Sequence, residues 1–385
     1  MNMATSRHGN GTLDVVQILD DLERLAPAGR AQRNLTAEAV GLLSSVGFFR
    51  AMLPAKFGGL ECHPVDFFKA AMQVAERDMS SAWICAVVGI HPFQVALMGE
   101  SALQEVYGSN PNTIVSSTYN PMGAKATAAD GGVMLSGRWA WSSGSLHAEW
   151  LLLGCIAPGE NLIYTCLVPK KDYVIEDTWF SMGLQGSGSN DVVITEPVFV
   201  PFSRIHKQTD GFLGLNDQPN KMYSIPWAQL FAATVAVPSI GAAKHALRLY
   251  IANKNASSID VAKMQGDPDV ARRVAEVDTL IDNAESSVMR NINKLVDMVN
   301  AGQEIPMLER ARIRYQTGSI VQNMIDAVDL LFAVAGGRSV YSGSAIQNIW
   351  LDIRMTHAHI ANNPVPLARN YGNMMLGLEN TNFFM

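Results

Sequence analysis

Residues 138–154 read RWAWSSGSLHAEWLLLG, two runs of aromatic and aliphatic side chains joined by serine and glycine. Such runs favour strands, and serine-glycine pairs mark turns. The surrounding segment, 112–205, holds further short runs of this kind between Gly, Asn, Asp or Pro clusters: TIVSSTY, GVMLSGRWAW, NLIYTCLVP and VVITEPVFV. Closely spaced strands without intervening helices predict an antiparallel sandwich or barrel at the centre of the chain.

On the N-terminal side, residues 13–107 show the apolar spacing of amphipathic helices. Pro64 suits the first turn of one helix, because its fixed φ matches the helical value. Ser80 or Ser81 suits the N-cap of the next helix. We therefore expect an N-terminal α-helical domain over residues 1–110.

On the C-terminal side, the helical spacing returns near residue 226. Four segments are long enough for a four-helix bundle, and a short helix follows at 365–376. These segments are Trp227–Asn253, Asp267–Asn300, Pro306–Ala335 and Ile346–Asn362. The chain is thus expected to be α+β, with a central β-domain over 111–205 and a C-terminal helix bundle over 206–385.

The composition limits the class of protein. Of 385 residues, 48% are hydrophobic and 17% are charged, whereas about 25% are charged in ordinary soluble domains. We therefore expect much buried surface, including a subunit interface. The net charge of −6 argues against nucleic acid as a partner.

The sequence also argues against secretion and against a membrane span. Residues 1–14 lack the apolar core of a signal peptide. Polar residues or prolines interrupt the apolar stretches at 83–98 and 230–243 before the ~20 residues that a span needs. We expect a cytoplasmic protein with no metal site and with reduced core thiols, because the cysteines lack metal-ligand spacing: Cys62, Cys85, Cys155 and Cys166.

Four segments, in this order, are similar to one family. GFFRAMLPAKFGG at 47–59, the quoted stretch at 138–154, MGLQGSGSNDVVITEPVFVP at 182–201 and AVAGGRSVYSGSAIQNIWLDIRM at 333–355 resemble the acyl-CoA dehydrogenase superfamily. The resemblance runs over residues 20–375. It implies the superfamily's fold, which is a helical domain, a β-barrel or sandwich and a four-helix bundle. It also implies a dimer of dimers, so we expect a homotetramer.

One segment distinguishes between two chemistries that this fold hosts. Residues 355–371, MTHAHIANNPVPLARNY, contain no Asp or Glu, whereas the common dehydrogenases carry their catalytic base there. DIRMTHAHIANN resembles instead the two-component flavin-dependent monooxygenases, such as the oxygenase component of 4-hydroxyphenylacetate 3-hydroxylase. That resemblance implies hydroxylation of a small phenol or indole-type ring through a C4a-hydroperoxyflavin. It also implies O₂ as co-substrate and reduced FAD or FMN from a separate NAD(P)H:flavin reductase.

Three alternatives stay open at this point. The first is an acyl-CoA dehydrogenase whose catalytic carboxylate is displaced to an earlier helix. The second is an N- or S-oxygenase on the same fold. The third is a non-catalytic helical assembly protein. The chain has no G-x-G-x-x-G βαβ unit for a nicotinamide, which agrees with flavin reduction by another protein.

The resemblance places His359 against the substrate. A neutral imidazole can accept the phenol or indole proton and so raise the electron density of the ring, which makes His359 the expected general base. His357, two positions away on a helix, would point to a different side. The resemblance also places an apolar stretch containing His91 and Phe93 near the substrate, and Ser116 is a further candidate. A buried structural role is the alternative for His91.

The resemblance assigns other residues to the flavin. Ser143 would hold the proton of flavin N5 and so prevent loss of H₂O₂, and Ser142, on the other face of the strand, is the alternative. Trp141 would form a flavin wall and, with Trp83, exclude water. Hydroxyl groups and a glycine-rich loop supply further expected contacts with the flavin: Ser117, Thr118, Ser187 and Ser189. In the family, a glycine turn and the helix after it reach the flavin of a neighbouring subunit, so Gly336, Gly337 and Arg338 are expected to contact a neighbour's flavin. A solvated strand end, a plain turn and a helix C-cap are the alternatives for these groups.

Overall fold

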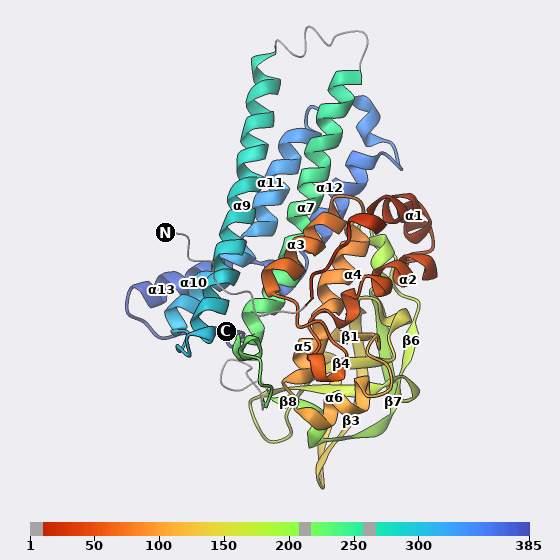
Figure 1. Cartoon of the computed structure of the whole chain (residues 1–385), viewed down its shortest axis with the longest axis vertical. Coiled ribbons are helices and arrows are strands. Elements are labelled where there is room, and N and C mark those ends of the chain that lie inside the picture. The colour runs from red at the N-terminus through yellow and green to blue at the C-terminus, as the bar shows by residue number, and fades with distance from the viewer. Residues whose placement is uncertain (1–10, 208–216, 257–266) are drawn as a thin grey trace.

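The chain has the expected α+β order of helices, then sheets, then a helix bundle (Figure 1). It is seen in a computed structural model that describes residues 11–207, 217–256 and 267–385. The polar residues 1–10, which argued against a signal peptide, lie outside the described residues.

Short α-helices form the N-terminal part: α1 (Leu19–Ala31), α2 (Ala37–Ser45), α3 (Pro64–Ala75), α4 (Met79–Gly89), α5 (His91–Ala96) and α6 (Glu100–Tyr107). The start of α3 at Pro64 confirms the prediction. The predicted cap of α4 was wrong, because Asp78 caps this helix. Its carboxylate accepts the backbone N–H groups of Ser80 and Ser81 at 3.3 and 2.8 Å.

Two four-stranded sheets form the middle part, in the orders β1-β4-β5-β8 and β2-β3-β7-β6. They enclose an apolar core of their own, separate from that of the helices. The predicted antiparallel pairing has one exception, because β1 runs parallel to β4; the intervening β2 and β3 pair in the other sheet. The strands are β1 (Val115–Thr118), β2 (Ala124–Ala129), β3 (Gly132–Ser142), β4 (Trp150–Ile156), β5 (Ile163–Pro169), β6 (Val174–Glu176), β7 (Asn190–Pro201) and β8 (Ile205–Lys207).

Long helices form the C-terminal bundle, and α7 packs against α3 and α4 of the N-terminal part as well as against α11 and α12 (Figure 1). The bundle is followed by a 3₁₀ turn, η11, and a last helix. The bounds are α7 (Trp227–Ala256), α9 (Pro268–Asn300), α10 (Met307–Gly318), α11 (Ile320–Phe332), α12 (Ala345–Thr356), η11 (Ile360–Asn362) and α13 (Pro364–Met375).

Two predicted helices end differently in the structure. The segment 306–335 is divided at Ser319, whose hydroxyl donates to the carbonyl of Tyr315 at 2.8 Å, a contact that tends to bend or end helices. α12 ends at Thr356, well before the predicted end, because the side chain of Asn362 donates to the Thr356 carbonyl at 2.8 Å. The residues that follow α12 are therefore not on a continuous helix.

Within the described residues, two helical segments are long and apolar enough to cross a membrane: Met79–Ala96 and Trp227–Ala252. The expectation that both stretches are too short was wrong by length and composition, since the segments span 18 and 26 residues. The protein buries 100% and 89% of their apolar windows, respectively. Packing inside the molecule therefore accounts for their apolar character.

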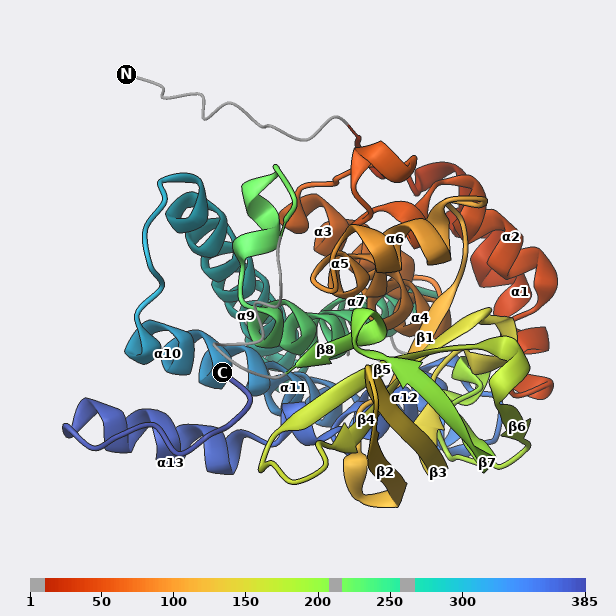
Figure 2. The same ribbon diagram turned by 90° about the horizontal axis from the view of Figure 1, so that it is seen from below.

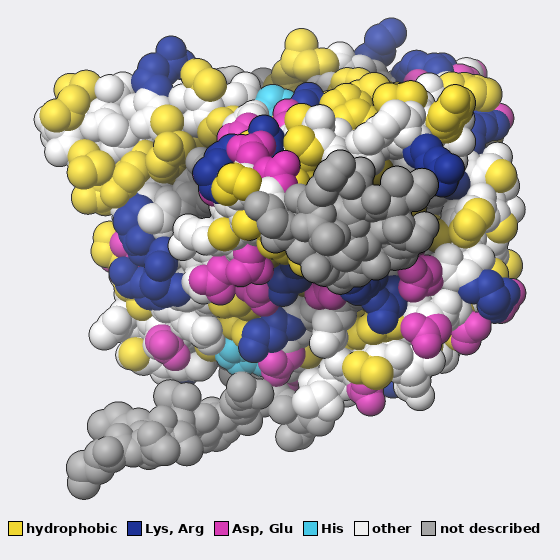
Figure 3. Space-filling view, turned by 90° about the horizontal axis from the view of Figure 1, so that it is seen from above, with side chains coloured by type: hydrophobic (Ala, Val, Ile, Leu, Met, Phe, Trp, Pro, Cys, Tyr) yellow, Lys and Arg dark blue, Asp and Glu magenta, His cyan; other side chains and the backbone are white. Residues whose placement is uncertain are grey.

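The surface carries basic and acidic side chains interspersed on the face in Figure 3, with several hydrophobic groups among them. Exposed apolar residues concentrate on α13 and the segment after it. α13 lies at one edge of the molecule, apart from the sheets (Figure 2). The exposed residues there are Val365, Met375, Leu376, Leu378 and Phe383.

Candidate active site

A bulge in β3 turns two neighbouring serines in different directions. The register with β7 shifts between Trp139 and Ser142, and Trp141 has a left-handed φ of 68°. The Ser142 hydroxyl lies 3.1 Å from that of Ser116 on β1. Ser143, just beyond the strand, has different side-chain partners, so Ser142 and Ser143 are not interchangeable.

Ser143 begins a buried line of hydroxyl groups. Its Oγ accepts the indole N–H of Trp83 at 2.9 Å and lies 2.8 Å from the hydroxyl of Ser189. Ser189 in turn lies 2.7 Å from the hydroxyl of Ser187. The Gly144 N–H donates to the Ser187 carbonyl at 2.9 Å, so the end of β3 and the glycine-rich loop are held together.

The hydroxyl run on β1 is buried and mostly bonded to the backbone of β3. Ser116 donates to the carbonyl of Ser143 at 2.6 Å, and Thr118 donates to the carbonyl of Ala140 at 2.7 Å. Ser117, between them, is also buried and points to the other face of its strand. The protons of Ser116 and Thr118 are therefore used to tie β1 to β3.

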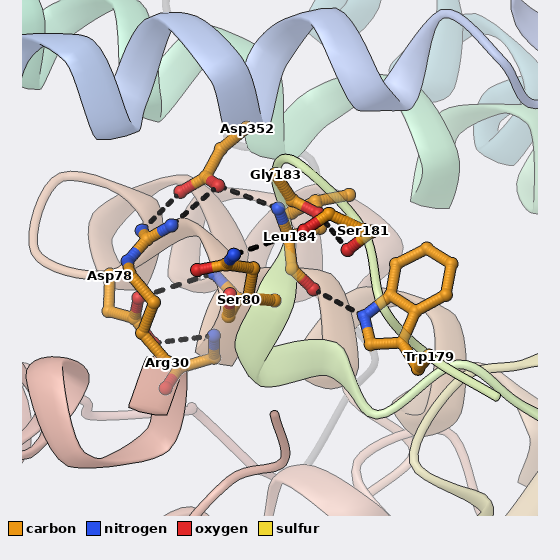
Figure 4. A network of polar contacts seen from close by, with 10 residues as sticks. Arg30, Asp78, Ser80, Trp179, Ser181, Gly183, Leu184 and Asp352 are labelled. Carbon is orange, nitrogen blue, oxygen red and sulfur yellow. Dashed lines mark hydrogen bonds and ion pairs between the residues drawn. The ribbon is translucent and has the colours of Figure 1, made fainter. Parts of the chain in front are cut away.

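An ion pair anchors the loop that carries Ser187 and Ser189 (Figure 4). The Asp352 carboxylate on α12 accepts two bonds from Arg30 at 3.1 and 2.7 Å and the N–H of Leu184 at 2.6 Å. Leu184 has a left-handed φ of 49°, so this bond fixes a strained turn. Burial raises the pKa of Asp352, and Arg30 opposes the rise.

His359 lies between the end of α12 and η11, next to Trp83. Its ring is 6.3 Å from that of Trp83 and 5.8 Å from that of Phe231, centroid to centroid. Its Nδ1 accepts the N–H of Ala361 at 3.2 Å. Burial, and then the positive charge of Arg314, lower the pKa of His359 to about 4, so the ring is neutral at pH 7.

His91 has the opposite hydrogen-bond pattern. It is fully buried on α5, and its Nδ1 lies 2.5 Å from the carbonyl oxygen of Val115. Its Nε2 has no hydrogen-bond partner among the described residues. Burial lowers the pKa of His91 to about 4, so this ring is also neutral at pH 7.

The partners assign the proton in each neutral ring. Nδ1 of His91 must donate to a carbonyl, which leaves a lone pair on Nε2. Nδ1 of His359 must accept an N–H, which places the proton on Nε2. His91 is therefore a hydrogen-bond acceptor and His359 a donor, although both are imidazoles.

Aromatic rings connect the two histidines. Tyr119 lies 6.3 Å from His91 and 5.0 Å from Phe231, which contacts His359. Phe93 stacks on Trp227 at 6.2 Å. Sequence reasoning missed Tyr119 and Phe231. The four-residue spacing of Trp227 and Phe231, which puts both on one face of α7, was an available signal.

Other predicted residues lie elsewhere in the described chain. Trp141, on the bulge of β3, is 66% exposed in this chain. Gly336, Gly337 and Arg338 are exposed and precede α12, whereas His359 follows its other end. That helix is about 18 Å long, so this turn and His359 lie at opposite ends of α12.

Comparison with known proteins identifies the family. Residues 233–364 match the family model described as acyl-CoA dehydrogenase, C-terminal domain. The chain is 33% identical over 373 residues to the flavin-dependent monooxygenase, oxygenase subunit HsaA, of Mycobacterium tuberculosis, with 94% of each chain covered. The chain belongs to the flavin-dependent monooxygenases, as an oxygenase component.

Further relatives agree with this. The oxygenase is 26% identical over 384 residues to the oxygenase component of p-hydroxyphenylacetate 3-hydroxylase of Acinetobacter baumannii, covering 95% of this chain and 88% of the relative. The crystal structure of 3-HSA hydroxylase from Rhodococcus sp. RHA1 matches with a TM-score of 0.90 at 30% identity, covering 96% and 99% of the two chains. The predicted fold and enzyme class are confirmed, and the dehydrogenase and non-catalytic alternatives are set aside.

The residues at the end of β3 suit a reduced flavin. A flavin ring needs hydrogen-bonding groups at its edge and flat apolar side chains against its faces. Ser143 has two lone pairs, one of which Trp83 uses. The hydroxyl of Ser145 is buried and has no partner within the described chain. Trp141 exposes its indole on the same bulge, so both kinds of group are present.

Proposed function

We propose that this oxygenase hydroxylates a small phenol or indole-type ring with O₂ and with reduced FAD or FMN from a separate NAD(P)H:flavin reductase. Reduced flavin, when bound, reacts with O₂ and supplies the oxygen atom. The residues of the chain bind and orient the ring, move its proton and exclude water. Ser143, Trp141 and the hydroxyls of Ser187 and Ser189 are the groups that would hold the flavin.

The observation that carries this proposal is the buried lone pair on Nε2 of His91. It has no partner in the described residues, so it suits a phenol O–H or an indole N–H as donor. Accepting that proton raises the electron density of the ring, which favours attack by an electrophilic oxygen. His91 is thus the proposed general base, in place of His359.

His359 takes the complementary role in this proposal. Its Nε2–H would donate to an oxygen atom of the substrate, while Trp83 and Phe231 hold the imidazole on two sides. A neutral donor at this position orients the ring without adding a charge to the apolar surroundings. His357, by contrast, lines a separate cavity of about 350 Å³ with Asp329 and Arg354.

Ser143 would keep a proton in place. When its hydroxyl donates to Ser189, its second lone pair is available to accept the N5–H of reduced flavin. Retention of that proton prevents the release of H₂O₂ without substrate oxidation. The buried partners Trp83 and Ser189 fix the position of Oγ, which supports the assignment of Ser143 over Ser142.

We further propose a homotetramer in the cytoplasm. The exposed apolar residues on α13 suit burial against a second copy. Arg338 is exposed before α12, which suits a contact with the flavin of a neighbouring subunit. Light scattering should give a mass near four times 41.8 kDa, and a monomer mass would contradict this part.

The function is tested with purified oxygenase, reduced FAD or FMN, a phenol or indole probe and oxygenated buffer. We expect a product heavier by one oxygen atom, and ¹⁸O₂ should label it. Omission of the oxygenase should abolish the product. Labelled product absent from every probe, with all O₂ recovered as H₂O₂, would contradict the proposal.

A further inference from the structure

Arg314 on α10 is a buried cation that no carboxylate pairs with in the described residues. Only 3% of the residue's surface is exposed to solvent. Burial lowers its pKa to about 10, so it stays charged at pH 7. Burying a charge without a partner of opposite charge costs several kcal/mol, so a ligand that supplies this partner would be stabilised here.

The contacts of Arg314 use only part of its hydrogen-bonding capacity. A guanidinium carries five N–H donors. One terminal nitrogen donates to the carbonyl of Ala361 at 2.9 Å. The Nε–H has no partner in the part of the chain that the structure describes. The ring of Phe384 lies 5.6 Å from the guanidinium carbon.

One residue links Arg314 to the candidate active site. The N–H of Ala361 donates to Nδ1 of His359, and the carbonyl of the same residue accepts from Arg314. Phe231 contacts both His359 and Phe384, with centroids 5.8 and 6.1 Å away. The guanidinium is therefore linked to His359 through Ala361 and to the aromatic cluster through Phe384.

We propose that Arg314 binds a carboxylate on the substrate, so that the natural substrate is an aromatic acid. This rests on the proposed function, because it assumes that the aromatic ring lies beside His359. The carboxylate would satisfy the unpaired N–H and neutralise the buried charge. Phe384 would cover the pair and keep water away from it, which strengthens the interaction.

The segment after α13 is held in place over this site. Asn370, on α13, accepts the N–H of Thr381 at 2.8 Å and donates to the side chain of Asn380 at 2.9 Å. These bonds fold the segment back, so that Phe384 reaches both Arg314 and Phe231. Phe384 can therefore be replaced without changing α10, which carries Arg314.

The test compares two probes of similar shape, 4-hydroxyphenylacetate and 2-(4-hydroxyphenyl)ethanol. Calorimetry under nitrogen measures the affinity of each for oxygenase saturated with reduced flavin. The wild type should prefer the acid by about 10- to 100-fold, the range for a hydrogen bond to a charged group. Arg314→Met should lose this preference, and Arg314→Lys should keep part of it.

Arg310→Met is the matched control. Arg310 lies one turn earlier on α10, is also buried, and donates to the carbonyl of Ile305 at 3.0 Å. Its loss should leave the acid preference unchanged. If Arg314→Met does not fold, Phe384→Ala, which exposes the guanidinium to water, should reduce the preference to a few-fold.

The outcomes separate this inference from the proposed function. Equal binding of both probes to the wild type, with hydroxylation of the neutral phenol, would overturn the inference and leave the proposed function standing. An acid preference retained in Arg314→Met would do the same. Failure of both probes to bind and to react would contradict both.

Discussion

Replacement of His91 by Gln tests the assignment of the base. The amide N–H₂ of Gln can still donate to the Val115 carbonyl, but its oxygen is not a base at neutral pH. Loss of a positioned general base typically slows a reaction by about 10²–10⁴-fold, and we expect that range for the hydroxylation of a phenol. Binding of the phenol should weaken by less than about tenfold, since one neutral hydrogen bond is worth about 0.5–1.5 kcal/mol.

The pH dependence provides a second, independent readout. Burial lowers the pKa of His91 to about 4, so its lone pair is available throughout the range from pH 5.5 to 8. Titration of His91 should therefore change the wild-type hydroxylation rate little between pH 5.5 and 8. In His91→Gln, the rate should rise with pH, because the fraction of phenol already ionised in solution increases about tenfold per pH unit below its pKa of about 10.

The assay measures hydroxylated product and H₂O₂ in the same single-turnover samples. His359→Gln is the control, because the amide can replace the proposed Nε2–H donor, and its rate should fall by less than about tenfold with an unchanged pH profile. If His91→Gln hydroxylates at the wild-type rate, or if His359→Gln instead acquires the rise with pH, the tautomer argument fails and His359 is the base.

Three further changes test separate parts of the molecule. Ser143→Ala should keep flavin affinity within about tenfold but increase the share of O₂ released as H₂O₂; an unchanged share would contradict its proton-holding role. Asp352→Asn leaves Arg30 without its carboxylate and should lower the free energy of unfolding by about 3 kcal/mol in urea titrations; no change would refute the anchoring role. Burial lowers the pKa of His245 to about 4, so the neutral ring contributes fully to the free energy of unfolding above pH 6.5, and this contribution is lost as pH falls towards 4. His245→Gln should reduce the fall in the free energy of unfolding between these pH values by about 3 kcal/mol. An unchanged fall in the variant would contradict this prediction.

Hydrophobic spacing predicts most helices because each buries one face along its whole length. The expected helix at 267–300 agrees with α9, whose N-cap is Asp267. The ends of α12 and α10 depend instead on particular side chains. Asn362 donates both to Thr356 and to the carbonyl of Val235 on α7, and a contact between distant segments leaves no periodic signal in the sequence.

The sequence indicated which residues are candidates for the site, but not which way their side chains point. Strand alternation indicated that only one of Ser142 and Ser143 could serve the flavin, and it left the choice between them open. The bulge at Trp141, with its left-handed φ, gives the two hydroxyls different partners, and this difference supports the proposal of Ser143. A bulge depends on the register between β3 and β7, which the sequence of one strand does not contain.

The two histidines show what residue type alone does not determine. His359 was expected on a helix, but it follows the end of α12, where its Nδ1 accepts the N–H of a residue two positions later. His91 owes its free lone pair to a carbonyl 24 residues away. Hydroxylation of a phenol needs an acceptor for its proton and benefits from a donor to its oxygen. In the proposed function one residue type supplies both, because the partner of each Nδ1 determines whether Nε2 accepts or donates a hydrogen bond.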